Sequence, residues 1–274
     1  MCDSTTPDRE QVAQTFDALR ASIRAERRRT AAERRAFETF ADRVDEVDIS
    51  DSSPRQSLDS GMREGHGATL VSSGHAGLDG DTPTEAIRSA YEETVMAVSF
   101  YDAEYGDDYP ASVRAEFGPE VATALIDPDC FGPSAKAALT AAIERAAREQ
   151  EHLIETCERE RESVDATANT LLPVVAELDS NVSPDPENES FGVLEARWNR
   201  LSRLRERCES VAANRQSSID DRRSHHGLPI DVPDVCAYLY QSHDSAYPIL
   251  SICTDLSQRV TKLRTAYERA MAHY

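Results

Sequence analysis

The chain is an acidic protein of 274 residues in which almost every basic side chain is arginine. It carries 50 Asp and Glu against 30 Lys and Arg, for a formal net charge of -20, and only Lys136 and Lys262 are lysines. Molar salt shortens the Debye length to about 3 Å and screens the self-repulsion of such a charge. Because arginine pairs with carboxylates better than lysine does, the composition favours a salt-filled cytoplasm over an ordinary acidic protein from a GC-rich genome.

Several classes of protein are excluded by what the sequence lacks. No run approaches the ~18 consecutive apolar residues of a membrane span, and the first residues lack the basic–apolar–small order of a signal peptide. Six scattered cysteines without a C-x-x-C pair predict reduced thiols in a cytosol. Neither a nucleophile elbow, a Walker A motif nor a dinucleotide fingerprint occurs. We therefore expect a cytoplasmic protein with no enzymatic activity, no cofactor and no small-molecule substrate.

A first long helix is predicted over residues 8–47. Heptad spacing runs through it with apolar ends and a polar middle, at Val12, Phe16, Leu19, Ile23, Glu26, Thr30, Glu33, Phe37, Phe40, Val44 and Val47. A long helix with a polar middle is not stable alone, so it needs a partner. Its apolar positions Phe16, Leu19, Phe37 and Phe40 are therefore predicted contact residues.

Residues 48–82 are predicted to be a disordered linker. Ser, Asp and Gly dominate the segment, Pro54 interrupts it, and no apolar period survives. So few apolar groups cannot offset the entropy of ordering the chain. The predicted domains are an N-terminal helix over 1–47, a linker over 48–82 and a helical bundle over 83–274.

Two shorter helices are predicted over residues 83–98 and 110–126. The first begins with Thr82 as N-cap, Pro83 in the first turn and Glu85 completing a capping box. Between the two helices, acids alternate with tyrosines at Tyr101, Asp102, Glu104 and Tyr105. Tyrosine supplies rigid amphipathic contact area, so these four residues form a candidate docking surface. The alternative is a hydrated turn whose tyrosines pack inward.

The longest helix is predicted over residues 133–179, with heptad spacing from Leu139 to Leu178. Pro173 lies inside it and predicts a kink or a break, because proline clashes with the carbonyl four residues earlier. Further helices are predicted over 190–222, 232–242 and 246–273, and no strand pattern occurs. Short connections between long helices favour antiparallel packing. The predicted fold is an all-α, elongated antiparallel bundle with coiled-coil heptad positions and a tethered N-terminal helix.

Two alternative binding functions follow from clusters of polar residues. Arg27, Arg28 and Arg29 could contact nucleic-acid phosphates, although counterion-release binding weakens steeply with salt. Zinc is the other possibility, although the close ligand pairs of zinc sites are missing. Its candidate ligands are His225, His226, Cys236, His243 and Cys253.

Several short segments resemble a group of uncharacterised haloarchaeal helical proteins that share a domain of unknown function. The similar segments are Tyr91–Val98 (YEETVMAV), Tyr101–Gly106 (YDAEYG), Glu116–Glu120 (EFGPE), Ala237–Tyr240 (AYLY) and Tyr247–Leu250 (YPIL). The resemblance implies an all-helical fold and a halophilic source. It implies no activity and no site residues.

The sequence as a whole predicts a non-enzymatic scaffold or regulator that works through protein–protein contacts. We expect self-association, or capture of a protein partner, through the heptad positions of the helices. A DNA-associated regulator is the first alternative, and a metal-binding helical bundle is the second.

Overall fold

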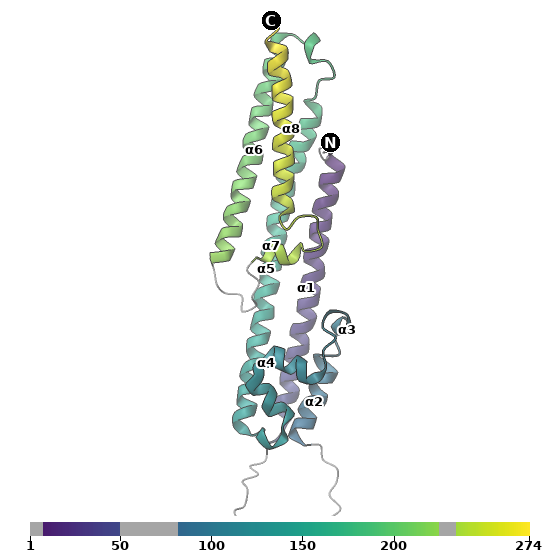
Figure 1. Cartoon of the computed structure of the whole chain (residues 1–274), viewed down its shortest axis with the longest axis vertical. Helices are drawn as coiled ribbons and strands as arrows, with labels where there is room; N and C mark the ends of the chain where they lie inside the picture. Colours follow the sequence, from purple (N-terminus) through teal and green to yellow (C-terminus); the bar gives the residue numbers. More distant parts are fainter. Residues whose placement is uncertain (1–7, 50–81, 225–233) are drawn as a thin grey trace, which may run out of the picture. The chain divides into compact units, whose positions relative to one another are not determined.

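The computed structural model describes residues 8–49, 82–224 and 234–274, and in these residues it contains only helices (Figure 1). The predicted linker over 48–82 falls almost entirely outside these ranges. Within them the all-α class is confirmed. The α-helices are α1 (Arg9–Glu46), α2 (Pro83–Thr94), α3 (Tyr101–Glu104), α4 (Tyr109–Ile126), α5 (Pro133–Ser180), α6 (Phe191–Ser224), α7 (Val235–Leu239) and α8 (Pro248–Met271), with 3-10 turns at Pro128–Cys130 and Pro186–Asn188.

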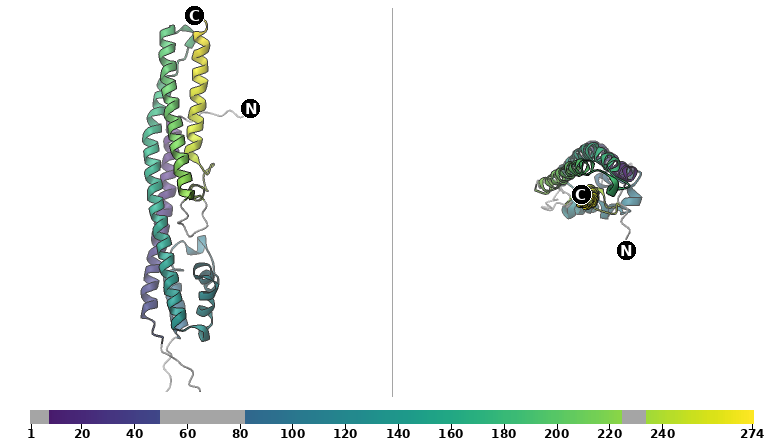
Figure 2. Two further views of the ribbon diagram at one scale, coloured as in Figure 1. Left: turned by 90° about the vertical axis from the view of Figure 1, so that its left-hand side faces the viewer. Right: turned by 90° about the horizontal axis from the view of Figure 1, so that it is seen from above.

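The long helices pack antiparallel, as predicted. Arg20 of α1 pairs with Asp165 of α5. Arg27 lies later in α1, and it pairs with Glu158, which lies earlier in α5. α6 and α8 lie side by side in both views (Figures 1 and 2). They too run in opposite directions, because residues near the start of α6 contact the end of α8. An example is the indole N–H of Trp198, which donates to Glu268 at 2.7 Å.

Local sequence signals set most helix starts. The Thr82 side chain accepts a hydrogen bond from the Glu85 N–H, and the Glu85 carboxylate accepts one from the Thr82 N–H, so the predicted capping box is confirmed. Asp108 caps α4 in a similar way through the Ala111 N–H. Within α4, Gly118 has a φ of +84°, a left-handed conformation that glycine adopts without strain, and the helix bends there before Pro119.

One helix boundary and one expected helix break differ from prediction. α2 ends at Thr94 rather than near residue 98, and the short helix α3 follows, which periodicity did not indicate. α5 has nearly its predicted limits, and of the predicted kink or break at Pro173 the break does not occur, because the helix continues to Ser180. Both Pro173 and Asn169, whose carbonyl loses its helical partner, lie on the exposed side of α5. Water can therefore bond that carbonyl, which lowers the cost of a proline inside the helix.

The chain forms two compact units, residues 1–31 with 149–274 and residues 32–148, and α1 and α5 contribute to both. In the first unit, α1 contributes Val12, Phe16, Leu19 and Ile23 to the core. In the second, it contributes Ala36, Phe37, Phe40 and Val44. The polar heptad positions between Ile23 and Phe37 therefore fall where one core ends and the other begins. A similar change occurs in α5 between Ala146 and Leu153, around the polar position Gln150.

An aromatic cluster forms the centre of the second unit. Phe40 packs edge-on against Tyr91, with ring centroids 5.2 Å apart, and lies nearly parallel to Phe117 at 6.1 Å. Tyr91 also packs edge-on against Tyr109, and its hydroxyl lies 2.8 Å from the Ser112 hydroxyl. Aromatic pairs in these geometries add stability beyond the apolar area that they bury.

We predict that Phe40→Ala destabilises the second unit by about 3–5 kcal/mol, the usual cost of removing a buried aromatic ring. Chemical denaturation followed by circular dichroism measures this change. The matched control is Thr39→Ala, one residue away on the exposed side of α1, which should change stability by less than about 0.5 kcal/mol. Equal effects of the two substitutions would contradict the assignment of Phe40 to the core.

Candidate functional site

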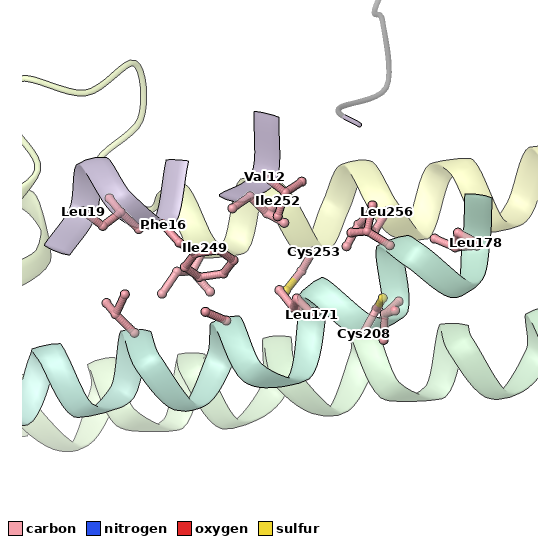
Figure 3. Close-up of a cluster of buried hydrophobic side chains, with 14 of the residues drawn as sticks. Val12, Phe16, Leu19, Leu171, Leu178, Cys208, Ile249, Ile252, Cys253 and Leu256 are labelled. Carbon is pink, nitrogen blue, oxygen red and sulfur yellow. The ribbon is translucent and has the colours of Figure 1, made fainter. Parts of the chain in front are cut away.

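The four predicted contact residues of α1 are buried inside the chain. Phe16, Leu19 and Phe40 are fully buried and Phe37 is 2% exposed. In the first unit, Phe16 and Leu19 face Ile249 of α8 and neighbouring apolar side chains (Figure 3). The partner that α1 requires is thus supplied by this chain's own helices. These residues do not offer a free contact surface, because their apolar faces are already covered.

The acid–tyrosine segment of the second unit divides between core and surface. Tyr101 is buried and lies 5.5 Å from Tyr105, measured between ring centroids. Tyr105 is 51% exposed, and its hydroxyl donates to the Glu33 carboxylate at 2.8 Å. Asp102 and Glu104 are exposed. The predicted inward packing therefore holds for Tyr101, whereas the other three residues remain at the surface.

A buried charged network joins α5, α6 and α7 in the first unit. Glu160 of α5 is fully buried and Arg215 of α6 is 4% exposed. The guanidinium donates to both carboxylate oxygens, and the Tyr240 hydroxyl donates to the same carboxylate at 2.6 Å. Arg215 also donates to Ser163 at 3.0 Å and contacts the Cys236 sulfur at 3.2 Å. The Arg215 guanidinium and the Glu160 carboxylate thus pair with each other in the interior, and both make further hydrogen bonds there.

The electrostatics of this network keep Arg215 charged and the Tyr240 hydroxyl protonated. Burial lowers the pKa of Arg215, but the hydrogen bond and charge of Glu160 outweigh that effect and raise it overall. Burial and the adjacent Glu160 charge raise the pKa of the Tyr240 hydroxyl, so it remains a proton donor. Neither Arg215 nor Tyr240 is therefore ready to exchange a proton near neutral pH, and these bonds suit structural positioning of the helices.

A second hydrogen-bond network fixes the turn between α5 and α6. Tyr267 of α8 is buried, its hydroxyl donates to the Asn181 carbonyl, and it accepts the Ser183 N–H at 3.0 Å. Arg197 of α6 donates to the same Asn181 carbonyl at 3.1 Å and to Glu189 at 2.9 Å. Side chains of α6 and α8 thus hold the turn from both sides, which makes its backbone rigid.

The outside of this rigid turn displays large apolar side chains. Among the described residues, six large hydrophobic side chains are exposed, and four of them, Val182, Phe191, Val193 and Tyr274, belong to the α5–α6 turn, the start of α6 and the end of α8. Figure 1 shows these segments together at one end of the first unit. Tyr274 packs edge-on against Phe191 and donates to the Glu189 carbonyl at 2.6 Å. We call these four residues the apolar patch.

Sequence patterns did not reveal the apolar patch. Tyr274 directly follows the helix predicted over 246–273 and continues its heptad spacing, yet it is 70% exposed. α8 ends at Met271, so the heptad register no longer dictates where the final residue points. Phe191 begins α6 and lies before the first buried heptad position, Leu194. The only available signal was a cluster of large apolar residues beside a predicted turn.

The residues of the nucleic-acid alternative are partly engaged within the chain. Arg27 pairs with Glu158 at 2.8 Å, and Arg29 contacts Glu26 at 3.7 Å. Arg28 is exposed, with no ion pair within the described ranges. Two of the three arginines are thus partly neutralised by carboxylates before any phosphate could approach.

The residues of the metal alternative do not come together within the described ranges, which exclude His225 and His226. Cys236 lies against Arg215, and Cys253 is buried in the apolar core. The His243 ring nitrogen Nε2 lies 2.9 Å from the Ser22 hydroxyl, which ties α1 to the segment before α8. In the part of the chain that the structure describes, no three His, Cys, Asp or Glu side chains are placed to hold one metal ion.

Comparison with known proteins places the chain in one family. Residues 14–264 match the model of a domain of unknown function, DUF7260, and the chain belongs to this family. No curated protein and no solved structure matches the chain. None of the described helices combines the length and apolar character needed to cross a membrane.

We predict that Arg215→Ala destabilises the first unit by about 3–5 kcal/mol, because it leaves the Glu160 charge buried without its partner. Denaturant unfolding at molar KCl measures the loss. The double variant Glu160→Met/Arg215→Met should recover most of it, since apolar side chains of similar size can replace a buried ion pair. Arg203→Ala, an exposed change on the same helix, is the control. A cost below about 1 kcal/mol for Arg215→Ala would contradict the account.

We also predict that native thiols differ sharply in reactivity. Burial raises the pKa of Cys157 and Cys253 to about 12 and that of Cys208 to about 11, so few thiolates exist at pH 8. Cys130 is exposed, although its hydrogen bond to Asp127 raises its pKa as well. Iodoacetamide at pH 8 should therefore alkylate Cys130 before Cys157, Cys208 and Cys253, as mass spectrometry of digested protein would show. Rapid alkylation of Cys157, Cys208 or Cys253 in the folded protein would contradict this prediction.

Proposed function

We propose that this member of the DUF7260 family is a non-enzymatic helical protein that acts through protein–protein contacts, as a scaffold or regulatory module in a high-salt cytoplasm. The observation that carries the proposal is the apolar patch on a turn that hydrogen bonds hold rigid. Phe191 and Tyr274 of this patch pack against each other, and adjoining exposed apolar side chains are a feature of interaction sites.

The packing of the helices supports a surface contact rather than an exchange of helices between copies. The heptad positions of α1, α5 and α8 are occupied almost entirely by contacts within the chain. Self-association through these positions would first have to separate the chain's own helices, and the apolar burial lost would have to be recovered in full. A patch that is already exposed needs no such rearrangement.

Rigidity adds to the value of the patch as a contact site. Ordering a loop or a set of side chains during binding reduces affinity. The Tyr267 and Arg197 hydrogen bonds order the α5–α6 turn in the free protein. Binding therefore does not have to order this turn, and affinity is not reduced on that account. A partner therefore meets Phe191 and Val193 in a fixed arrangement.

High salt favours contacts of this type. Charge–charge attraction across a surface is screened within about 3 Å at molar ionic strength. Apolar burial persists under those conditions and is strengthened by salts that are excluded from the protein surface. For a chain of this composition, an apolar contact site is the more effective means of recognition.

The two alternatives find less support. Nucleic-acid binding depends on Arg27, Arg28 and Arg29, of which Arg27 and Arg29 contact carboxylates, and molar salt weakens phosphate binding further. A metal-binding bundle would have to rely on His225 and His226, which lie outside the described ranges. We therefore favour a protein partner.

The test compares capture of partners by the parent protein and by Phe191→Ser/Val193→Ser at molar KCl. Quantitative mass spectrometry should show a protein that the parent captures stoichiometrically and that the variant loses by about tenfold or more. Ile126→Ser is the matched control, because Ile126 is equally exposed but belongs to the other unit. Equal capture by all three proteins, or no partner with the parent, would contradict the proposal.

A further inference from the structure

The charges around the apolar patch are strongly one-sided. Residues 182–195 contain four acids and no basic residue. Glu187 and Glu195 are exposed and have no ion pair within the described part of the chain. Glu189 is the exception, since it pairs with Arg197. Arg269, in the last turn of α8, is the nearest exposed basic residue along that helix. The patch therefore has an acidic rim with little internal neutralisation.

The acidic rim disfavours a second copy of this chain as the occupant. A two-fold contact places the same patch on both sides of the interface. Glu187 and Glu195 of one copy would then approach the equivalent acids of the other, and like charges juxtaposed across an interface cost free energy. A partner with basic residues around its apolar side chains would face attraction instead.

The size of the patch also indicates the kind of partner. Stable interfaces between two folded proteins use ~20–30 residues on each side, whereas the patch offers four large apolar side chains. Such a surface matches the anchors of a single short segment, in which two or three apolar side chains recur on one face of a helix.

We infer that the apolar patch binds an amphipathic helical segment of another protein, with apolar side chains that contact the adjoining rings of Phe191 and Tyr274 and with Arg or Lys residues that face Glu187 and Glu195. This inference rests on the proposed function and adds the chemistry of the partner. The apolar contacts supply affinity at any salt concentration. The acidic rim selects basic flanks, most strongly where salt is moderate.

The test uses two synthetic amphipathic peptides that share the same leucines and carry either arginine or glutamate at the polar positions. Binding of each to full-length protein is followed by fluorescence anisotropy at moderate and at molar KCl. The arginine peptide should bind more tightly, by about tenfold at moderate salt, and the difference should shrink at molar salt. Phe191→Ser/Val193→Ser should weaken both peptides, whereas Ile126→Ser should leave both unchanged.

Charge reversal separates the apolar part of the inference from the electrostatic part. In Glu187→Arg/Glu195→Arg the preference should invert, so that the glutamate peptide binds more tightly at moderate salt. Both positions are exposed, and an unchanged circular dichroism spectrum would confirm that the variant is folded. Equal binding of the two peptides to the parent protein, or unchanged preference in the reversed variant, would overturn the basic-flank assignment.

Two further outcomes distinguish this inference from the proposed function. If sedimentation shows a dimer of the parent that Phe191→Ser abolishes, the occupant is a second copy and the inference is wrong, although a protein–protein function stands. If neither peptide binds and the capture experiment nevertheless finds a partner that depends on Phe191, the inference alone fails. If neither peptide binds and no partner is captured, both fail.

Discussion

The ion pair between Glu160 and Arg215 joins α5 to α6, and both of its side chains are buried in the first unit. A carboxylate in the middle of an apolar helix face is costly unless a cation and hydrogen-bond donors reach it. Arg215 and Tyr240 donate to this carboxylate, and Arg215 donates a further hydrogen bond to Ser163. These bonds form only when α5, α6 and α7 are in one register. With apolar heptad positions alone, one helix could shift by seven residues along its neighbour. The ion pair between Glu160 and Arg215 forms in only one of these registers, so it fixes the alignment of α6 against α5.

That alignment has consequences at the α5–α6 turn. With α6 fixed against α5 and α8 packed along α6, Tyr267 reaches the backbone of Asn181 and Ser183, and Arg197 reaches it from the other side. The turn is ordered as a result, and the large side chains that do not fit the core, Phe191 and Val193 among them, stay outside on a fixed backbone. The apolar patch is thus a product of how the interior is arranged.

Sequence periodicity predicted the parts of this structure that depend on local chemistry. Helix limits, the Thr82 capping box and the burial of heptad residues such as Phe16 and Phe40 follow from patterns within a few turns. The split of α2 and α3 escaped prediction because the packing of Tyr91 and Tyr101, rather than propensity, decides it. Glu160 falls at a heptad position, but nothing in the sequence distinguishes Arg215 from the other 27 arginines as its partner. The sequence also did not show that this chain's own helices cover Phe16 and Phe37, because periodicity does not say which helix is the partner.

One measurement addresses the role of the apolar patch most directly: photo-crosslinking at molar KCl with benzoylphenylalanine in place of Phe191, and in place of Tyr105 as a second exposed aromatic position. If the patch is the contact site, position 191 should form an adduct with one segment of a partner protein, and that segment should be apolar with basic flanks. Position 105 should not form the same adduct. Adducts at both positions alike, or none at position 191 while a partner is present, would show that the protein makes its contacts elsewhere.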